Sequence, residues 1–417
     1  MSRLAVVTAL VASVLFTVAT PAVAAAAADP VARQRVREVP ASIVSDCSTD
    51  VTTALGHWIA SVPNRSTLRL RRDGCYRIDG TLTVAGREHL TLDGRGATLQ
   101  AKTPGDIGRR HLVIAGGRDI VLRNLTVRGA NANARAPGGS YDGSKAFQHA
   151  FSFIGVQKGR LDKVQAYDVY GDFVYIGSGP KGTDPKSTGW SRDIKVTNST
   201  FEGSGRQGIS VTAGKKIVID RNTIGGAGQT LIDLEANSPE GGAVDVRITH
   251  NRTGAARHFW LANKGAGTQI RDIVVEHNRM TEATGGLVFV YGPSGGYRGP
   301  FRFVDNRFVA SNHVRDEGSQ GAFFLSRVNG ALIRGNVVTF PAGQQMPAVE
   351  NQDSLNIVVK GNTFTNAGKE VITTTRGTTP PATAPPTTAP PTTAPRVTVP
   401  PTTARATAPP TTALRTG

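Results

Sequence analysis

The sequence predicts an all-β solenoid, in which the chain winds through successive coils of short strands. Three observations lead to this prediction. Apolar residues alternate with others over runs too short for helices, as in Ile209-Ser210-Val211 and Ile217-Val218-Ile219. Glycine and asparagine close these runs, as is typical of half-buried strands. The pattern of strand, corner, strand and asparagine recurs along most of the chain, which indicates a repeat protein.

An asparagine follows the second strand of each predicted repeat and sets the repeat length. The spacings are 24, 29, 27, 28, 30 and 26 residues, and the positions are Asn198, Asn222, Asn251, Asn278, Asn306, Asn336 and Asn362. Asparagine tolerates left-handed backbone and can form ladders of hydrogen bonds with identical neighbours. We therefore expect a column of asparagines at one corner, with a structural role.

A repeat of this length with three strands and no helix resembles the right-handed parallel β-helix of the pectate-lyase-like superfamily. The resemblance extends from about Cys75 to about Thr375. It implies an all-β, single-stranded right-handed parallel β-helix over residues 75–375, with a ligand cleft along one sheet. The family hosts many functions, so the resemblance implies carbohydrate chemistry without fixing a reaction.

Taken in chain order, residues 1–28 have the features of a secretory signal peptide. Arg3 precedes an apolar run from Leu4 to Val18, and Ala22-Val23-Ala24 follows. No later run is long and apolar enough to span a bilayer. We therefore expect a secreted protein.

Residues 29–74 precede the predicted repeats and contain an amphipathic pattern from Thr49 to Ser61. This pattern predicts a helix, capped by Ser48 or Thr49 and ended by Pro63. The apolar face of that helix would contain Val51, Leu55, Ile59 and Val62. Because the open end of a β-helix presents unpaired strand groups, we expect this helix to cap it.

Cys47 and Cys75 are the only cysteines, and they bracket that segment. In an exported chain such a pair predicts a disulfide, which would tie the helix to the first coil.

We expect the first coils to be built from closely spaced short strands that are separated by glycines. These are Leu68-Arg69-Leu70, Tyr76-Arg77-Ile78, Leu82-Thr83-Val84, Leu90-Thr91-Leu92 and Thr98-Leu99. Further coils are expected over residues 112–127 and 147–166.

Residues 376–417 form a Pro/Thr-rich tail, in which Pro-Pro-Thr-Thr-Ala begins at Pro385, Pro390, Pro400 and Pro409. Such a composition predicts an extended, disordered stalk that holds the protein near the cell wall by contact.

The net charge of +17 predicts an anionic partner. Without Arg3, Asp29 and the tail arginines, 43 basic and 30 acidic residues remain. No helical reading element or base-stacking platform is evident, so we expect no nucleic-acid partner. An acidic polysaccharide or wall polymer fits an exported β-helix better. We expect a monomer, and no metal motif identifies a cofactor.

The resemblance implies a cleft along one sheet. That sheet is made by the strand that follows the longer corner of each repeat. Aligning these strands predicts one outward column, made of Phe153, Tyr175, Ser210, Asp233 and Leu261. A second column one step further would contain Gly177, Thr212, Glu235 and Asn263. At the strand entry the same alignment brings together His149, Asp172, Arg206, Gln207, Arg257 and His258. Loops over residues 129–145, 178–191, 236–243 and 292–300 would flank this groove.

Two catalytic mechanisms and one binding role remain open. Asp233 and Glu235 are two residues apart on one strand, which puts their Cβ atoms roughly 6.5–7 Å apart on one face. That suits an inverting glycoside hydrolase. Alternatively, a uronate lyase could neutralise its substrate with Arg206, Arg257 or Lys264 and use Tyr175 or His258 as base.

The third alternative is a non-catalytic glycan- or wall-binding solenoid displayed on the tail. Its aromatic contacts would be Tyr175, Trp190, Trp260, Tyr291 and Tyr297. The motifs of polygalacturonases, calcium-dependent pectate lyases and mannuronan epimerases are not found, so the three alternatives stay open.

Overall fold

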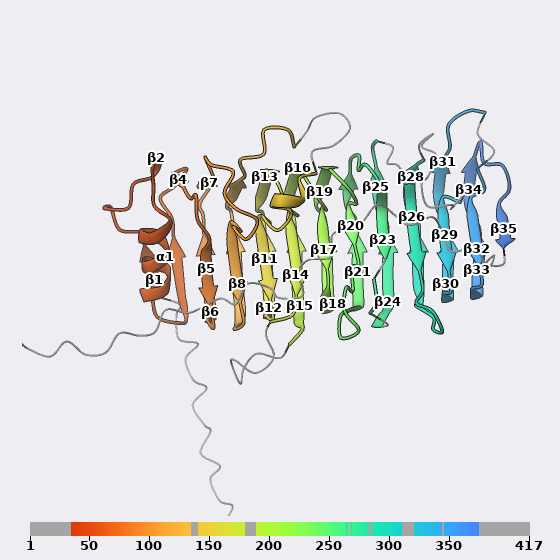
Figure 1. Cartoon of the computed structure of the whole chain (residues 1–417), viewed down its shortest axis with the longest axis horizontal. Helices are drawn as coiled ribbons and strands as arrows, with labels where there is room; N and C mark the ends of the chain where they lie inside the picture. The colour runs from red at the N-terminus through yellow and green to blue at the C-terminus, as the bar shows by residue number, and fades with distance from the viewer. Residues whose placement is uncertain are drawn as a thin grey trace, which may run out of the picture. The chain divides into compact units, whose positions relative to one another are not determined.

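The computed structural model describes residues 35–134, 141–179, 189–263, 265–267, 269–282, 286–310, 321–343 and 346–374. The predicted signal peptide and the Pro/Thr-rich tail lie outside these residues, as does Lys264. The described residues form three parallel sheets of twelve, twelve and eleven strands. Successive strands of the chain belong to the three sheets in turn. This is a parallel β-helix, with its coils stacked in order from the red end to the blue end of Figure 1.

Sheet A carries the strand that precedes the asparagine corner. Its strands, in spatial order, are β1 (Arg35–Glu38), β3 (Ser66–Arg69), β6 (Glu88–Asp93), β9 (Arg118–Arg123), β12 (Gln157–Asp162), β15 (Ser191–Thr197), β18 (Ala213–Asp220), β21 (Gly242–Thr249), β24 (Gln269–Glu276), β27 (Phe301–Val304), β30 (Asn329–Arg334) and β33 (Leu355–Lys360).

Sheet B carries the short strand that follows the asparagine corner. Its strands are β2 (Asp46–Asp50), β4 (Cys75–Arg77), β7 (Thr98–Gln100), β10 (Thr126–Arg128), β13 (Gln165–Val169), β16 (Thr200–Ser204), β19 (Thr223–Ala227), β22 (Arg252–Thr253), β25 (Arg279–Met280), β28 (Arg307–Val309), β31 (Val337–Thr339) and β34 (Thr363–Thr365).

Sheet C carries the strands of the predicted cleft. They are β5 (Leu82–Ala85), β8 (Leu112–Ala115), β11 (Phe151–Ile154), β14 (Val174–Gly177), β17 (Ile209–Val211), β20 (Ile232–Asp233), β23 (Phe259–Asn263), β26 (Gly286–Tyr291), β29 (Phe323–Ser326), β32 (Val349–Gln352) and β35 (Val371–Thr374).

The core fills the space between the sheets with the inward side chains of every strand. Fully buried aromatic residues anchor most coils, and they include Tyr76, Phe151, Phe153, Phe173, Phe201, Trp260, Phe301, Phe308 and Phe323. Trp260 therefore packs inside and cannot form part of an aromatic binding surface.

The asparagine ladder lies at the corner between sheets A and B. From Asn222 to Asn336, each side chain donates through Nδ2 to Oδ1 of the next asparagine, at 2.9–3.0 Å, and Asn362 is the last acceptor. Each Nδ2 from Asn222 to Asn336 also donates to a strand carbonyl oxygen. The prediction is confirmed for six positions and is wrong for Asn198. Ser199 takes the ladder position there, since its N–H donates to Asn222 Oδ1.

Two rows of left-handed residues accompany the coils and explain the position of Asn198. One row interrupts the sheet A strands and contains His89, Asp119, Lys158, Asp193, Lys216, Asp245 and Asp272, with φ of 52–59°. The other directly precedes the corner and contains Arg95, Asn124, Lys163, Asn198, Arg221, His250, His277 and Asp305, with φ of 51–57°. Because each coil turns at the same two places, successive coils superimpose and the strands keep their register.

The helix α1 (Thr52–Ser61) confirms the predicted helix, and its apolar face is the predicted one. It begins three residues later than expected because residues 46–50 form β2, which pairs with β4. Neither Ser48 nor Thr49 caps it; instead Asp50 Oδ1 accepts from the Thr52 N–H, at 2.9 Å. The helix lies against β5, the edge strand of sheet C, where Gly80 N–H donates to Thr52 Oγ1.

The Cys47–Cys75 disulfide is confirmed and links β2 to β4. The last coil has several exposed apolar residues. Leu355, Val358 and Val371 are 48%, 45% and 43% exposed.

No helix among the described residues combines the length and apolar character needed to cross a membrane.

Candidate functional site

The outward face of sheet C presents a column of side chains over five neighbouring coils, and the first four of them are polar. The pairing of the strands sets this column as Ser152, Tyr175, Ser210, Asp233 and Ala262. The predicted members Phe153 and Leu261 were wrong by one residue. Both are fully buried and point into the core.

Asn263 was also expected to face the groove, and the structure places it inside. It pairs with Val290, a core residue, and it is fully buried. Neither of its side-chain amide atoms has a hydrogen-bond partner within the described residues. Asn263 therefore cannot contact a ligand on the outward face.

Arg206 lies at the centre of the candidate site, in the corner before β17. Its Nη1 donates to both carboxylate oxygens of Asp172, at 3.1 and 2.9 Å. Its Nη2 donates to Glu235 Oε2 at 2.6 Å. Burial alone would lower the pKa of Arg206, but Asp172, Glu235 and Asp233 raise that pKa well above its ordinary value. The guanidinium is thus a fixed cation, and both of its Nη groups are hydrogen-bonded to carboxylates.

Asp172 is the buried anchor of the network. Its carboxylate accepts from Arg206, from the Gln207 N–H at 3.1 Å and from Ser210 Oγ at 2.7 Å. Burial raises the pKa of Asp172, while Arg206 and Ser210 oppose that shift. With no exposed surface, Asp172 positions its neighbours and cannot touch a substrate.

His149 packs beside Asp172 as a neutral ring. Its Nδ1 accepts from the Asp172 N–H at 2.9 Å, so the 3.5 Å contact between Nδ1 and Asp172 Oδ2 is not an ion pair. Burial and the cations Arg110 and Arg206 hold the pKa of His149 well below its ordinary value. Its Nε2 has no hydrogen-bond partner within the described residues.

Tyr175 forms one wall of the site. Its ring stacks on His149 with centroids 4.9 Å apart, and Arg110 lies 5.7 Å from the ring centre. Thr212 Oγ1 donates to its hydroxyl at 3.0 Å. A Cβ at position 177 would lie 2.7 Å from the ring, so Gly177 leaves the space that Tyr175 occupies. Burial raises the pKa of Tyr175.

Asp233 and Glu235 bring two carboxylates to the rim of this network. Asp233 Oδ2 accepts from Gln207 Nε2 at 2.8 Å, and Gln207 Oε1 accepts from the Thr230 N–H. Glu235 follows β20 and is held by Arg206, with 12% of its side chain exposed. The structure therefore joins seven predicted residues in one network: His149, Asp172, Tyr175, Arg206, Gln207, Asp233 and Glu235.

The next coil contributes Arg257 and His258, which precede β23. Both are exposed, and the His258 N–H donates to the Gln229 carbonyl oxygen of the neighbouring coil. They lie at the entry of the same sheet, beyond the buried part of the network.

Sequence reasoning missed a second buried group on the coil before β11. Arg110 faces Tyr175, and Arg109 Nη1 contacts His111 Nε2 at 3.1 Å. Burial and Arg109 lower the pKa of His111 to about 3. The run Arg109-Arg110-His111 precedes β8 as His149 precedes β11. Including β8 in the strand alignment would have revealed these residues.

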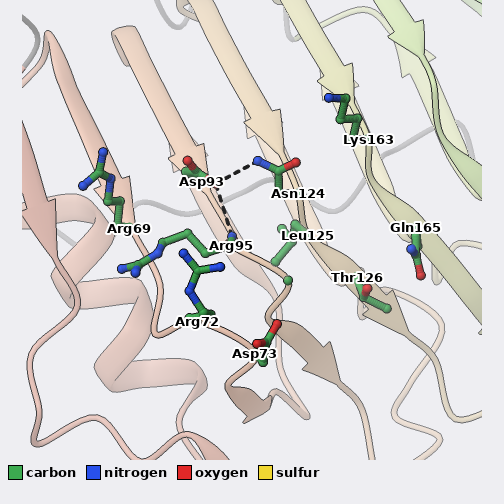
Figure 2. Close-up of a pocket in the computed structure, with 11 residues that line it drawn as sticks. Arg69, Arg72, Asp73, Asp93, Arg95, Asn124, Leu125, Thr126, Lys163 and Gln165 are labelled. Carbon is green, nitrogen blue, oxygen red and sulfur yellow. Dashed lines mark hydrogen bonds between the residues drawn. The ribbon is translucent and has the colours of Figure 1, made fainter.

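A separate cavity of about 780 Å³ lies at the corner between sheets A and B of the first coils. Figure 2 shows Arg69, Arg72 and Arg95 around it, with Asp73 and Asp93. Glu38 already pairs with Arg69 and Arg95, and Asp93 pairs with Arg123. It contains none of the predicted site residues, so we place the candidate site on sheet C.

Within the described residues, no group of three or more His, Cys, Asp or Glu side chains is placed to hold a metal ion.

Three parallel sheets stacked coil on coil define the class of right-handed parallel β-helix proteins. The family model described as "Right handed beta helix region" matches residues 153–380, and the chain belongs to that family. No curated protein sequence matches the chain.

Several solved structures share the fold. The exopolygalacturonase of family 28 from Yersinia enterocolitica is 12% identical with a TM-score of 0.55, over 82% of this chain and 77% of that one. DFA-IIIase from Arthrobacter chlorophenolicus without its lid is 12% identical with a TM-score of 0.54, over 82% and 92%. The surface adhesin PfbA of Streptococcus pneumoniae is 15% identical with a TM-score of 0.52, over 79% and 90%. These likenesses concern the fold alone.

Proposed function

We propose that the protein is a secreted glycoside hydrolase that cleaves a polysaccharide on the outward face of sheet C. The observation that supports this most directly is the pair of contacts from Arg206 to Asp172 and Glu235, which we call the Arg206 clamp. A buried aspartate and a buried arginine fix Glu235 beside Asp233 at the rim of a polar groove. Perturbed buried groups around a pair of rim carboxylates are a common feature of catalytic sites.

In the proposed reaction, Asp233 donates a proton to the glycosidic oxygen as the bond to the anomeric carbon breaks. Glu235 accepts a proton from the water that forms the new bond to that carbon. We assign the base to Glu235 because Arg206 fixes one of its carboxylate oxygens, at 2.6 Å. This is the division of roles in an inverting reaction, in which the two carboxyl groups lie about 6.5–9.5 Å apart and hold the water between them.

The lyase alternative has weaker support. It needs a cation for the substrate carboxylate, but Arg206 is already bound to Asp172 and Glu235. It also needs a base, and the raised pKa of Tyr175 makes that hydroxyl harder to deprotonate. Arg257 and His258 are the remaining exposed candidates, and they lie on the next coil.

The binding alternative requires several aromatic side chains along one groove. Trp260 is in the core. Trp190 directly precedes β15 of sheet A, and its indole N–H donates to the Glu240 carbonyl oxygen. Tyr297 is 47% exposed and belongs to a corner outside the network. Tyr291, in contrast, stacks on Phe289, which follows Asp233 and Ala262 in the outward column of sheet C. One of the expected aromatic residues therefore lies on the face of the groove and supports the binding alternative.

Secretion is part of the proposal and is supported by the apolar N-terminal run and by the disulfide, which forms in oxidising compartments. An acidic polymer is favoured as substrate because the described coils are basic. We expect the protein to act as a monomer that contacts the cell wall through its tail.

A polysaccharide screen tests the proposal. Secreted protein is incubated with acidic and neutral polysaccharides, and new reducing ends and new ultraviolet absorbance from double bonds are both measured. A hydrolase gives reducing ends alone, and Glu235→Gln removes them without loss of folding. Absorbance from double bonds would make the protein a lyase. Saturable binding without either product would make it a binding protein.

A further inference from the structure

Three arginines occupy the same position on three successive strands of sheet B. Arg252 of β22 pairs in register with Arg279 of β25, and Arg279 pairs with Arg307 of β28. All three side chains are exposed. Parallel strands lie about 4.8 Å apart, so three cationic groups begin from backbone positions that span roughly 10 Å along the coil stack.

This arrangement is unfavourable without a partner, because like charges at facing positions of neighbouring strands repel. Within the part of the chain that the structure describes, none of the three guanidinium groups forms an ion pair or a hydrogen bond. Some arginines elsewhere on the surface are paired, as Arg123 is with Asp93, Arg128 with Asp168, and Arg302 with Glu276.

The groups around the three arginines do not neutralise the row. The corner residues two positions earlier are His250, His277 and Asp305, and the two histidine rings stack with centroids 5.2 Å apart. Asp220 contacts His250 Nδ1 at 3.0 Å and also pairs with Arg221. Asp305, Glu276 and Glu282 are the acidic residues nearest in sequence, and Glu276 already contacts Arg302, so the row keeps a positive excess.

We propose that Arg252, Arg279 and Arg307 form a binding track for a linear polysaccharide that carries one carboxylate per sugar. Guanidinium groups bind carboxylates in a planar, two-point geometry. A chain with one carboxylate per sugar repeats its charge at a distance close to the strand spacing. Each arginine of the track would then meet one sugar carboxylate.

Nucleic acid fits this track less well. Duplex DNA carries its charges every 1.7 Å of axis over both strands, far more densely than the strand spacing. Single strands are bound by stacking bases on aromatic platforms. Of the three strands of the track, none contributes a Phe, Tyr or Trp that faces outward.

The track is separate from the proposed catalytic groove, because it lies on sheet B and the groove lies on sheet C. The proposal concerns binding and does not rest on the proposed function. A chain held on sheet B would raise the local concentration of substrate or hold the protein on an acidic wall polymer.

The test measures binding of the full-length secreted protein to polygalacturonate and to its fully methyl-esterified, neutral form. The variant carries Arg252→Gln, Arg279→Gln and Arg307→Gln. The control variant loses the same charge from exposed, unaligned positions of sheet A, through Arg118→Gln, Lys158→Gln and Lys195→Gln. Single-stranded DNA and polyphosphate serve as competing polyanions. Thermal midpoints establish that all proteins are folded.

We expect the track variant to bind polygalacturonate at least tenfold more weakly and with a smaller salt dependence, and the control to change less than threefold. The neutral polymer should bind neither protein tightly. Equal losses in both variants would overturn the proposal in favour of general charge attraction. Unchanged binding in the track variant, or a preference for DNA or polyphosphate over polygalacturonate, would also overturn it. The test measures binding and not turnover. Its result can therefore be interpreted even if the hydrolase assay detects no activity.

Discussion

Asp233 is the carboxylate on which the proposed chemistry most depends. Its strand fixes its direction, and Gln207 holds one of its oxygens. Asp233→Asn keeps the shape and removes the acid, so we expect turnover on the active polysaccharide to fall about 10²–10⁴-fold. The thermal midpoint should stay within a few degrees, because asparagine keeps the shape and an oxygen that can still accept from Gln207 Nε2.

A matched control is Asp245→Asn on sheet A, an exposed position where the backbone is left-handed and asparagine is tolerated. It should leave turnover unchanged. If Asp233→Asn retains full turnover, the chemistry belongs to Arg257 and His258. If it loses turnover together with its folded state, Asp233 is a structural partner of Gln207.

His111 predicts a pH dependence of stability. Its pKa is about 3 in the folded protein and 6.5 when unfolded, so the unfolded chain binds the extra proton below pH 6.5. Stability from this residue is therefore present above pH 6.5 and falls by about 1.4 kcal/mol per pH unit as the pH drops. Asp172 acts in the opposite sense, since its raised pKa means that the folded protein holds the proton longer.

Urea unfolding of wild type and His111→Gln at pH 7, 6 and 5 isolates the histidine contribution. The variant should lose less stability on acidification than the wild type. His57→Gln, at an exposed position, should follow the wild type. Parallel pH curves for His111→Gln and wild type would show that His111 titrates normally.

At the level of residues, the sequence predicted which strand positions lie side by side better than it predicted the direction of each side chain. Tyr175, Ser210 and Asp233 were aligned correctly because their strands alternate polar and apolar residues. The strand from Phe259 to Asn263 is apolar on both faces, since Phe259 and Ala262 pack outside the core. Alternation therefore could not fix its register, and Leu261 and Asn263 were assigned to the wrong face. The Arg206 clamp depends on corner geometry, which a strand pattern does not encode.

Among elements, the asparagine ladder makes the clearest energetic prediction. Asn278 Oδ1 accepts from both the Asn251 N–H and Asn251 Nδ2. Asn278→Ala would leave the buried Asn251 N–H without this acceptor, and it would remove the bonds from Asn278 Nδ2 to the Ile248 carbonyl oxygen and to Asn306 Oδ1. We expect a loss of about 2–3 kcal/mol in the free energy of unfolding.

Urea unfolding measures that loss, with Asn133→Ala in an exposed loop as the control, which should change stability by less than about 0.5 kcal/mol. A loss equally small for Asn278→Ala would mean that water replaces the ladder bonds. The ladder was predictable from its spacing, whereas the two left-handed rows were not. Their residues include Asp, Lys, Arg and His, which do not signal a turn as glycine does.

For the whole molecule, the Cys47–Cys75 disulfide closes a loop of 28 residues at the N-terminal end. Replacing both with serine should lower the free energy of unfolding by roughly 3–4 kcal/mol, by the chain-entropy argument. Chemical denaturation of the double variant and of wild type with and without reductant measures this. If reduction leaves the midpoint unchanged, pairing of β2 with β4 alone holds that end.

The two ends of the coil stack differ in a way that determines where the protein opens first. Edge strands at both ends carry apolar residues that are about half exposed, Val36 at the first end and Leu355, Val358 and Val371 at the last. At the first end, however, a helix and a disulfide lie beside the first strands. In repeat proteins each coil is stabilised mainly by its neighbours. Amide hydrogens of β33, β34 and β35 should therefore exchange with solvent first, and protection should rise coil by coil toward the middle of the chain. The candidate site lies several coils away from these last strands. It would therefore remain folded while the last coils unfold and refold.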